Sequence, residues 1–294
     1  MYWMIVMTDA IKIKNLSKSF GNFSLGPIDL GIKKGTITGF IGENGAGKST
    51  TIKLILDVIG RDNGAIEIFG KDIKNLAVDE KYKLGFVYDD LFLPGTMKVG
   101  EIEKFHSLLY KDHWEKGTFY EFMENFSLPV NIPIETFSRG MKMKLGLALA
   151  MSHGAEILIL DEPTSSLDPV VRDDFLDILL DFIQDENHTV LISSHILSDL
   201  EKIADYIAFI HKGELIFNEE KDGLSEKYGL VSLGDEEFES LDESALVGVR
   251  KHQFGRECLV RREKMPDNFE VSKPSIEDIM VYMIKEAYNE SLDI

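Results

Sequence analysis

The sequence predicts an α/β fold with a parallel-strand core, an N-terminal antiparallel β region, an inserted helical subdomain and a small C-terminal accessory region. Three observations support this. The N-terminus alternates apolar and polar residues, which is typical of half-buried strands. Two continuous apolar segments, EILIL at 156–160 and TVLISS at 189–194, have the pattern of buried parallel strands. The helical segment PVVRDDFLDILLDFI separates them, as a parallel connection requires.

The predicted antiparallel region comes first. IKIKNL at 11–16 and FSLGPIDLGI at 23–32 alternate apolar and polar side chains, so each is expected to be a strand with one buried face. TITGFI at 36–41 is a short buried strand that leads into the glycine-rich segment GENGAGKST. The residues KSTTIKLILDVIG then predict a helix that ends near Gly60.

The middle of the chain is expected to be a helical insertion. GAIEIFG at 64–70 and KLGFVY at 83–88 are predicted strands, after which the pattern becomes helical from 91 to about 151, punctuated by prolines. Beyond Gly223 the apolar pattern weakens and acidic residues cluster, until a final predicted helix, SIEDIMVYMIKEAY. We therefore place a boundary near Leu224, with domains at 1–223 and 224–294.

Composition excludes several classes of protein. Fifty-one acidic residues against 32 basic residues give a formal net charge of −19, which repels nucleic-acid backbones, so no nucleic-acid partner is expected. The single cysteine, Cys258, provides neither an internal disulfide nor metal-ligand spacing. No segment reaches the roughly 20 consecutive apolar residues that a membrane-spanning helix needs.

The segment at 42–50 carries the first chemical motif. Its spacing G-x4-G-K-[ST] lets backbone N–H groups surround the phosphates of a nucleotide at a helix N-terminus. Lys48 is expected to neutralise phosphate charge and Ser49 to bind Mg²⁺ through its hydroxyl. A purely structural glycine turn is the alternative. The predicted ATP-binding residues of this loop are Gly42, Glu43, Asn44, Gly45, Ala46, Gly47, Lys48, Ser49 and Thr50.

Two carboxylates end the apolar strand in EILILDEP at 156–163. Asp161 is expected to reach Mg²⁺ through water, and Glu162 to polarise the attacking water. Taken alone, this pair is more often a solvated loop. Paired with the loop at 42–50, it predicts a nucleotide-hydrolysing site in a P-loop NTPase core.

The segment FSRGMKMKLGLALAM at 137–151 begins with a serine and a glycine at an expected helix N-terminus, which is a natural anion site. A plain N-cap, in which Ser138 accepts a backbone hydrogen bond, is the alternative. The position of the segment, about 20 residues before the Asp–Glu pair, favours the functional interpretation.

Together these segments resemble the ATP-binding-cassette (ABC) family over residues 11 to about 220. FSRGM resembles the family signature, usually LSGGQ, and TSSLD at 164–168 resembles its D-loop. By this resemblance His195 is the switch histidine that contacts the γ-phosphate, and Phe20 in LSKSFG is the aromatic residue that stacks on adenine, with Phe23 as a rival. Asp168 would act across a dimer interface rather than only capping a helix.

The resemblance also implies partners. Two cassettes, identical or from paralogues, would meet head to tail, so that Ser138 and Gly140 contact ATP bound by the other subunit. Separate transmembrane permease subunits would receive the motion, with hydrolysis depending on Lys48, Glu162 and His195. The chain would then lie in the cytoplasm, peripheral to the inner face of the cell membrane.

The sequence departs from the family pattern at several positions. GFVYDD places Asp89 where the family usually has a glutamine; Asp89 can bind Mg²⁺ but cannot donate an amide hydrogen bond. In the signature, Arg139 and Met141 replace a glycine and the glutamine, and Arg139 either approaches a phosphate or a partner carboxylate or simply points to solvent.

These variations resemble the drug- and peptide-export branch of the family, and more narrowly the ATPase subunits of staphylococcal exporters of phenol-soluble modulins. The expected function is therefore ATP hydrolysis that powers export of amphipathic or antimicrobial peptides or drugs. Two alternatives are a regulatory cassette that hydrolyses ATP weakly and a soluble ABC ATPase with no role in transport.

Overall fold

The computed structural model describes residues 8–88, 91–252, 255–266 and 268–290, and these form two compact units. The first unit ends at Asn218 and the second begins at Glu219. The boundary predicted near Leu224 falls a few residues later, inside helix α8 (Lys221–Lys227). Among the described residues, no helix is long and apolar enough to cross a membrane.

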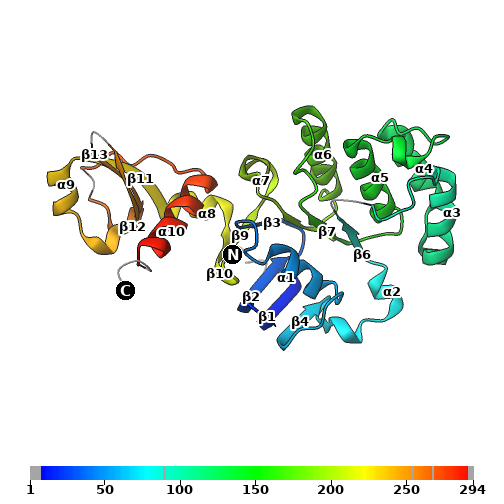
Figure 1. Cartoon of the computed structure of the whole chain (residues 1–294), viewed down its shortest axis with the longest axis horizontal. Coiled ribbons are helices and arrows are strands. Elements are labelled where there is room, and N and C mark those ends of the chain that lie inside the picture. The colour runs from blue at the N-terminus through cyan, green and yellow to red at the C-terminus, as the bar shows by residue number, and fades with distance from the viewer. Residues whose placement is uncertain (1–7, 89–90, 253–254, 267, 291–294) are drawn as a thin grey trace, which may run out of the picture. The chain divides into compact units, whose positions relative to one another are not determined.

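A six-stranded sheet with the order β10-β9-β3-β8-β7-β6 forms the centre of the first unit (Figure 1). Strand β3 pairs in parallel with β8 and β9, and β7 pairs in parallel with β6 and β8. The strands are β3 (Ile37–Ile41), β6 (Leu84–Val87), β7 (Ile157–Asp161), β8 (Thr189–Ser193), β9 (Tyr206–His211) and β10 (Glu214–Glu220).

Helices cover this sheet, because its central strands are apolar on both faces. All five residues of β3 and of β8 are buried, as are the first four of β7, and a parallel sheet is stable only when both faces are covered. The helices connected to it are α1 (Lys48–Ile55), α2 (Val78–Lys81), α6 (Pro169–Phe182) and α7 (Leu197–Ile203).

Helix α1 is shorter than the sequence predicts. It ends at Ile55 rather than near Gly60. The backbone of Asp57 turns left-handed, with φ of 54°, and the N–H of Val58 donates back to the carbonyl of Lys53 at 2.9 Å. These two features close the helix in a tight turn, although the apolar pattern continues beyond it.

The expected antiparallel region is a four-stranded sheet with the order β2-β1-β4-β5. Its strands are β1 (Asp9–Phe20), β2 (Phe23–Lys33), β4 (Asn63–Ile68) and β5 (Lys71–Asp72). Alternate apolar residues of β1 and β2, such as Ile11 and Ile28, are fully buried and share one core cluster with Phe40 of β3 and Ile52 of α1. This shared core fixes the antiparallel sheet beside the loop at 42–47.

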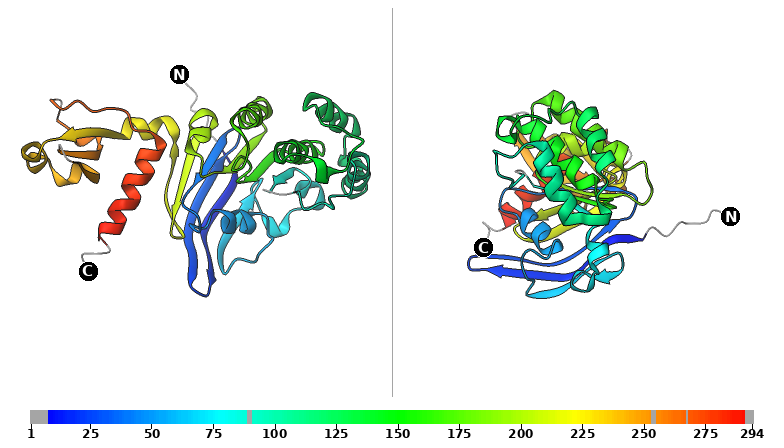
Figure 2. Two further views of the ribbon diagram at one scale, coloured as in Figure 1. Left: turned by 45° about the horizontal axis from the view of Figure 1, so that its top comes forward. Right: turned by 90° about the vertical axis from the view of Figure 1, so that its right-hand side faces the viewer.

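The predicted helical insertion lies between β6 and β7 and has a core of its own. Its helices are α3 (Val99–Tyr110), α4 (Lys116–Asn125) and α5 (Arg139–Met151), and Figures 1 and 2 show them gathered on one side of the first unit. Val99, Phe119, Met123 and Leu145 belong to the buried cluster that joins them.

The second unit contains a sheet that the sequence analysis missed. Strands β11 (Tyr228–Leu233), β12 (Leu246–His252) and β13 (Gly255–Arg261) form an antiparallel sheet in the order β11-β13-β12. Helices α9 (Asp235–Ser240) and α10 (Ile276–Glu290) accompany it, and α10 is the final helix that the sequence predicts. Buried residues including Val231, Leu233 and Val260 form its core.

Short 3₁₀ helices complete the described elements: η1 (Ile73–Asn75), η2 (Lys111–His113), η3 (Ile134–Thr136), η4 (Glu243–Ala245) and η5 (Arg262–Lys264).

Candidate active site

Three functional segments meet at one edge of the six-stranded sheet. The loop at 42–47 follows β3, the Asp161–Glu162 pair ends β7, and the segment with His195 follows β8. Because β3, β8 and β7 are parallel neighbours, their carboxyl ends lie side by side. The topology therefore brings together residues that are more than 140 positions apart in the sequence.

The loop at 42–47 has the geometry of an anion cradle. Gly45 and Gly47 have φ values of 84° and 117°, and a Cβ atom on Gly47 would lie only 2.6 Å from Cδ1 of Leu25. No side chain caps the N-terminus of α1. Its first-turn N–H groups and the positive end of the helix dipole therefore suit a phosphate.

Lys48 supplies the cation at this loop. Its side chain is only 6% exposed, and its Nζ donates to the carbonyl of Gly42 at 2.7 Å and to that of Glu43 at 3.3 Å. The same Nζ lies 3.2 Å from Oε1 of Glu162, so the ammonium joins the loop to the end of β7.

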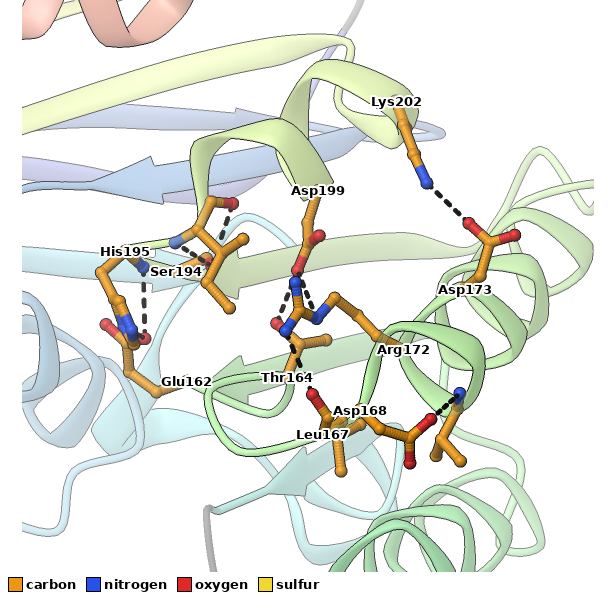
Figure 3. Close-up of polar contacts among 12 residues, drawn as sticks. Glu162, Thr164, Leu167, Asp168, Arg172, Asp173, Ser194, His195, Asp199 and Lys202 are labelled. Atoms are coloured by element: carbon orange, nitrogen blue, oxygen red, sulfur yellow. Dashed lines mark hydrogen bonds and ion pairs between the residues drawn. The ribbon is translucent and has the colours of Figure 1, made fainter.

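Glu162 also contacts His195, as Figure 3 shows. Oε2 of Glu162 lies 2.5 Å from Nδ1 of the His195 ring and accepts a 3.2 Å hydrogen bond from the His195 backbone N–H. The structure thus unites the three predicted catalytic residues, Lys48, Glu162 and His195, around one carboxylate. Such a group can hold a water molecule next to a phosphate and accept its proton.

Ser193, the last residue of β8, is a positioning residue that the sequence analysis missed. Its Oγ donates to Oδ1 of Asp161 at 2.7 Å and accepts from the backbone N–H of Glu162 at 3.0 Å. The hydroxyl thereby orients the carboxylate of Asp161 and the backbone of Glu162. The only signal in the sequence is a serine at the end of an apolar strand, which by itself does not indicate a partner on another strand.

The backbone of Glu162 is strained. Its φ is 51°, a conformation that costs a residue with a side chain about 1–3 kcal/mol. The N–H of Glu162 donates to both the carbonyl and the hydroxyl of Ser193, which hold this conformation. Strain of this kind collects at functional sites because the surrounding structure maintains a side-chain direction that the backbone alone would not adopt.

The donor set of the site fits MgATP. Lys48 and the first-turn N–H groups of α1 suit phosphate oxygens, while Ser49, Asp161 and Glu162 present hard oxygen donors of the kind that Mg²⁺ prefers. In the described part of the chain, no group of three or more His, Cys, Asp or Glu residues could hold a metal ion alone. Mg²⁺ usually takes few protein ligands and completes its shell with phosphate oxygens and water. Asp89, the other predicted metal ligand, lies outside the described residues.

A second missed contact involves the loop itself. Oε1 of Glu43 lies 2.7 Å from Nδ1 of His211, a buried residue at the end of β9. The contact connects the loop to a strand on the other side of β3.

The predicted signature and D-loop residues lie at the N-termini of α5 and α6. Ser138 caps α5 by accepting a 3.2 Å hydrogen bond from the N–H of Met141, and a Cβ on Gly140 would lie 2.5 Å from Cγ1 of Val171. Asp168 caps α6 by accepting 3.1 Å hydrogen bonds from the N–H groups of Val170 and Val171. Among the described contacts, none joins Ser138, Gly140 or Asp168 to the loop at 42–50.

Ser138, Arg139 and Asp168 are exposed. The capping roles of Ser138 and Asp168 therefore leave room for contacts with a second chain, and their action across a dimer interface stays a prediction.

The two aromatic candidates for the adenine lie at the end of the β1–β2 hairpin. Phe20 is 43% exposed, and Nζ of Lys18 lies 5.5 Å from its ring centre. Phe23 is partly buried, and its Cζ lies 3.3 Å from the place that a Cβ on Gly47 would occupy. Phe23 therefore packs against the loop, whereas Phe20 is exposed beside Lys18; stacking on adenine stays a prediction for Phe20.

Sequence comparisons connect this geometry to known proteins. Residues 25–165 match the family described as ABC transporter. The chain is 34% identical over 213 residues to the bacitracin transport ATP-binding protein BcrA of Bacillus licheniformis, covering 71% of this chain and 69% of that protein. It is 35% identical over 226 residues to the lantibiotic transport ATP-binding protein SrtF of Streptococcus pyogenes, covering 72% and 92%.

One relative extends into the second unit. The linearmycin resistance ATP-binding protein LnrL of Bacillus subtilis is 29% identical over 282 residues, which cover 94% of this chain and 90% of that protein.

Solved structures share the fold of the first unit. The ATP-binding subunit of an ABC transporter superimposes with a TM-score of 0.65 at 24% identity, over 73% of this chain and 91% of that chain. A dimeric ATP-binding cassette, MJ0796, in a post-hydrolysis state bound to ADP and Pi gives a TM-score of 0.62 at 22% identity, over 71% and 98%.

Proposed function

The chain belongs to the ABC transporter family as an ATP-binding cassette, and from this we propose that it hydrolyses ATP to power export through separate membrane subunits. The observation that carries the proposal is the contact of one carboxylate, Glu162, with both Lys48 and His195 beside the loop at 42–47. An ion pair that only stabilises the fold would need Lys48 or His195 as a partner of Glu162, but not both.

Charge competition suggests how ATP activates the site. The ammonium of Lys48 lies 3.2 Å from Glu162 and is also held by loop carbonyls. The phosphates of ATP carry more negative charge than one carboxylate, so they draw Lys48 towards themselves and release Oε1 of Glu162. That oxygen is then free to accept a proton from an attacking water molecule, while His195 keeps the other oxygen in place.

Mg²⁺, when bound through Ser49 and Asp161, neutralises part of the phosphate charge. Ser193 keeps the Asp161 carboxylate oriented towards that position, since its hydroxyl donates to Oδ1 at 2.7 Å. The chain itself then contributes positioning and charge, which supply most of the catalysis of phosphoryl transfer.

A second cassette completes the proposed site. Ser138 and Asp168 are exposed at the N-termini of α5 and α6, and their hydrogen bonds in the described part of the chain go to their own helices, so both are available to a nucleotide held by another subunit. We therefore propose a head-to-tail dimer, either of two identical chains or of this chain with a paralogue.

An apolar hollow supports the proposal of a membrane partner. It has a volume of about 420 Å³, and its lining includes Phe86, Tyr88, Phe92, Phe105 and Leu109 from β6, α3 and the segment between them. Phe86, Phe92, Phe105 and Leu109 are each at least 49% exposed. Exposed apolar side chains gathered at one place usually mark a protein interface, and a separate membrane subunit is the occupant that the family suggests.

For the cargo we propose amphipathic or antimicrobial peptides, or drugs. The relatives named for transport of bacitracin, for transport of a lantibiotic and for linearmycin resistance support this class. The phenol-soluble modulins of staphylococci are a narrower proposal, which rests on the sequence variations at 85–90 and 137–142, the compact helical insertion and the acidic C-terminal tail.

Hydrolysis is tested with Glu162→Gln. The amide keeps the size of the side chain but is a far weaker base, so we expect the ATPase rate to fall by at least about 100-fold while ATP still binds. Release of phosphate by the purified full-length chain measures the rate. Lys48→Ala, which removes the cation from the loop, is expected to abolish ATP binding as well.

The dimer is tested with the same variant. Glu162→Gln with ATP is expected to elute as a dimer on a sizing column and as a monomer with ADP. Equal low ATPase rates for wild type and Glu162→Gln would contradict the catalytic assignment and favour a regulatory cassette.

A further inference from the structure

Three side-chain contacts link the end of β7 and the segment after it to the end of β8 and the segment after it. Ser193 contacts Asp161 and His195 contacts Glu162, as described above. The third contact lies farther from the loop: Oγ1 of Thr164 donates to Oδ2 of Asp199 at 2.9 Å. Figure 3 shows the second and third contacts side by side. Thr164 comes two residues after Glu162, and Asp199 comes four residues after His195.

Asp199 is a buried acid on helix α7. It is 3% exposed, Thr164 is fully buried, and burial raises the pKa of the Asp199 carboxyl. A buried carboxyl group is unfavourable unless it has hydrogen-bond partners, and here the partner is the Thr164 hydroxyl. Among the described contacts, neither residue reaches the loop at 42–47, so the hydrolysis proposed above does not account for this hydrogen bond.

Arg172 extends the contact to the far end of the 164–168 segment. Its Nε lies 3.9 Å from Oδ2 of Asp199, and its Nη2 donates to the carbonyl of Leu167 at 3.0 Å. Leu167 immediately precedes the helix-capping Asp168. The Asp199 carboxylate thus accepts a hydrogen bond from Thr164 at one end of the 164–168 segment and forms a longer ion pair with Arg172, which donates to Leu167 near the other end (Figure 3).

We propose that Asp199 is a positioning residue: through Thr164 it sets the contact between Glu162 and His195, and through Arg172 it places Asp168 for the partner subunit. This inference rests on the proposed ATPase function. Glu162 and Thr164 belong to one short backbone segment, and His195 and Asp199 to another. The Thr164–Asp199 hydrogen bond fixes the distance between these two segments. Loss of that hydrogen bond lets the two segments separate and weakens the contact between His195 and the Glu162 carboxylate.

The test uses Thr164→Val, which removes the hydroxyl while keeping the side-chain shape. Thr38→Val is the matched control, because Oγ1 of Thr38 is buried on β3 without a hydrogen-bond partner among the described residues. We expect Thr164→Val to lower kcat for ATP hydrolysis by at least about 10-fold with KM unchanged within about 2-fold, since small misplacements of catalytic groups reduce rates strongly. Thr38→Val should keep the wild-type kcat.

Variants of Asp199 separate positioning from simple packing. Asp199→Asn keeps an oxygen that can accept from Thr164, so kcat is expected to stay within about 3-fold of wild type. Asp199→Leu keeps the branching of the side chain but has no acceptor, and its kcat is expected to fall to the level of Thr164→Val. Should Thr164→Val not fold, as judged by circular dichroism, Thr164→Ala takes its place.

A readout that does not depend on turnover is the ring-nitrogen resonance of His195. In protein labelled with ¹⁵N-histidine, the signal of His195 is the one lost in His195→Gln. We expect Thr164→Val to move it towards its position in Glu162→Gln, and Thr38→Val to leave it unchanged. A wild-type kcat together with a wild-type His195 signal in Thr164→Val would overturn the inference.

Failure of the proposed ATPase function can be distinguished from failure of the Asp199 inference. If wild type hydrolyses ATP no faster than Glu162→Gln, the ATPase assignment fails. The His195 resonance then decides the Asp199 inference by itself: movement in Thr164→Val supports it and no movement overturns it.

Discussion

At the scale of single residues, the site is organised around the carboxylate of Glu162. Lys48 approaches one oxygen, His195 approaches the other, and Ser193 holds the backbone N–H. Because the backbone of Glu162 is itself in a left-handed conformation, the side chain cannot relax without breaking these contacts. The same residue is therefore both the proposed base and the point at which three segments are joined.

Asp168 allows a capping role to be separated from an interface role. Asp168→Ala removes the acceptor for two N–H groups of α6 and should lower the free energy of unfolding by about 1 kcal/mol. Asp168→Ser retains a cap and should stay within a few tenths of a kcal/mol of wild type. Thermal unfolding measures both differences.

If Asp168 also acts on a second subunit, both variants lose the contact that needs a carboxylate. Introduced into Glu162→Gln, each should reduce the fraction of ATP-dependent dimer on sizing. Full dimerisation of the Asp168→Ser variant would show that Asp168 only caps its helix.

At the scale of elements, the helical insertion is joined to the core through stacked rings. The ring of Tyr110 at the end of α3 lies 4.1 Å from that of His153 and 5.8 Å from that of His106. Nδ1 of His153 contacts the carbonyl of Tyr82, next to β6, at 2.7 Å. Position and stability of the insertion therefore depend on two histidines that are largely withdrawn from water.

Burial lowers the pKa of His106 from its usual value of 6.5 to about 4, and the nearby His153 adds to the effect. The unfolded chain therefore binds a proton between pH 6.5 and 4 that the folded chain does not bind. The stability associated with neutral His106 is present above pH 6.5 and is lost as the pH falls towards 4.

His106→Phe tests this effect, because phenylalanine keeps a ring but does not titrate. Between pH 7 and pH 5 we expect the variant to lose about 2 kcal/mol less stability than wild type, from the factor of 1.4 kcal/mol per pH unit. Thermal unfolding of the first unit at the two pH values measures the difference. The control is His252→Phe, at an exposed position on β12, whose stability should fall between the two pH values as much as that of wild type. A wild-type pH dependence of stability in His106→Phe would contradict the prediction.

At the scale of the whole molecule, the two compact units have separate cores. Leu158 of β7 is fully buried in the first unit, whereas Leu233 of β11 is 2% exposed in the core of the second. All the predicted nucleotide-binding residues belong to the first unit. A ligand at that site should consequently stabilise one unit and leave the other unchanged.

Calorimetry of the full-length chain tests this separation. We expect two unfolding transitions. In the Glu162→Gln background, ATP at about 100 times its Kd should raise the free energy of unfolding of the first unit by about 2.7 kcal/mol. Leu158→Ala should lower the free energy of unfolding of the ATP-sensitive unit by about 2–5 kcal/mol, and Leu233→Ala should lower that of the other unit by a similar amount. A single transition that moves with ATP and with both substitutions would show that the units unfold together.

The local parts of this fold and site could be predicted from the sequence alone. The loop at 42–50, the pair Asp161–Glu162 and the alternation of β1 and β2 are encoded in consecutive residues, because each depends on backbone geometry or side-chain period over a few positions. The sheet of the second unit was missed because its three strands are short and lie close to a cluster of acidic residues that obscures the alternation.

Contacts between segments were decided only by the tertiary structure. Ser193 reaches Asp161, Asp199 reaches Thr164 and His211 reaches Glu43 because parallel strands place their carboxyl ends side by side, whatever their separation in the chain. No local pattern specifies which buried hydroxyl or carboxylate will face which partner across a sheet. A phosphate-binding loop and an acidic pair can be recognised in the sequence, whereas the residues that hold them in place depend on the packing of strands that are distant in the chain.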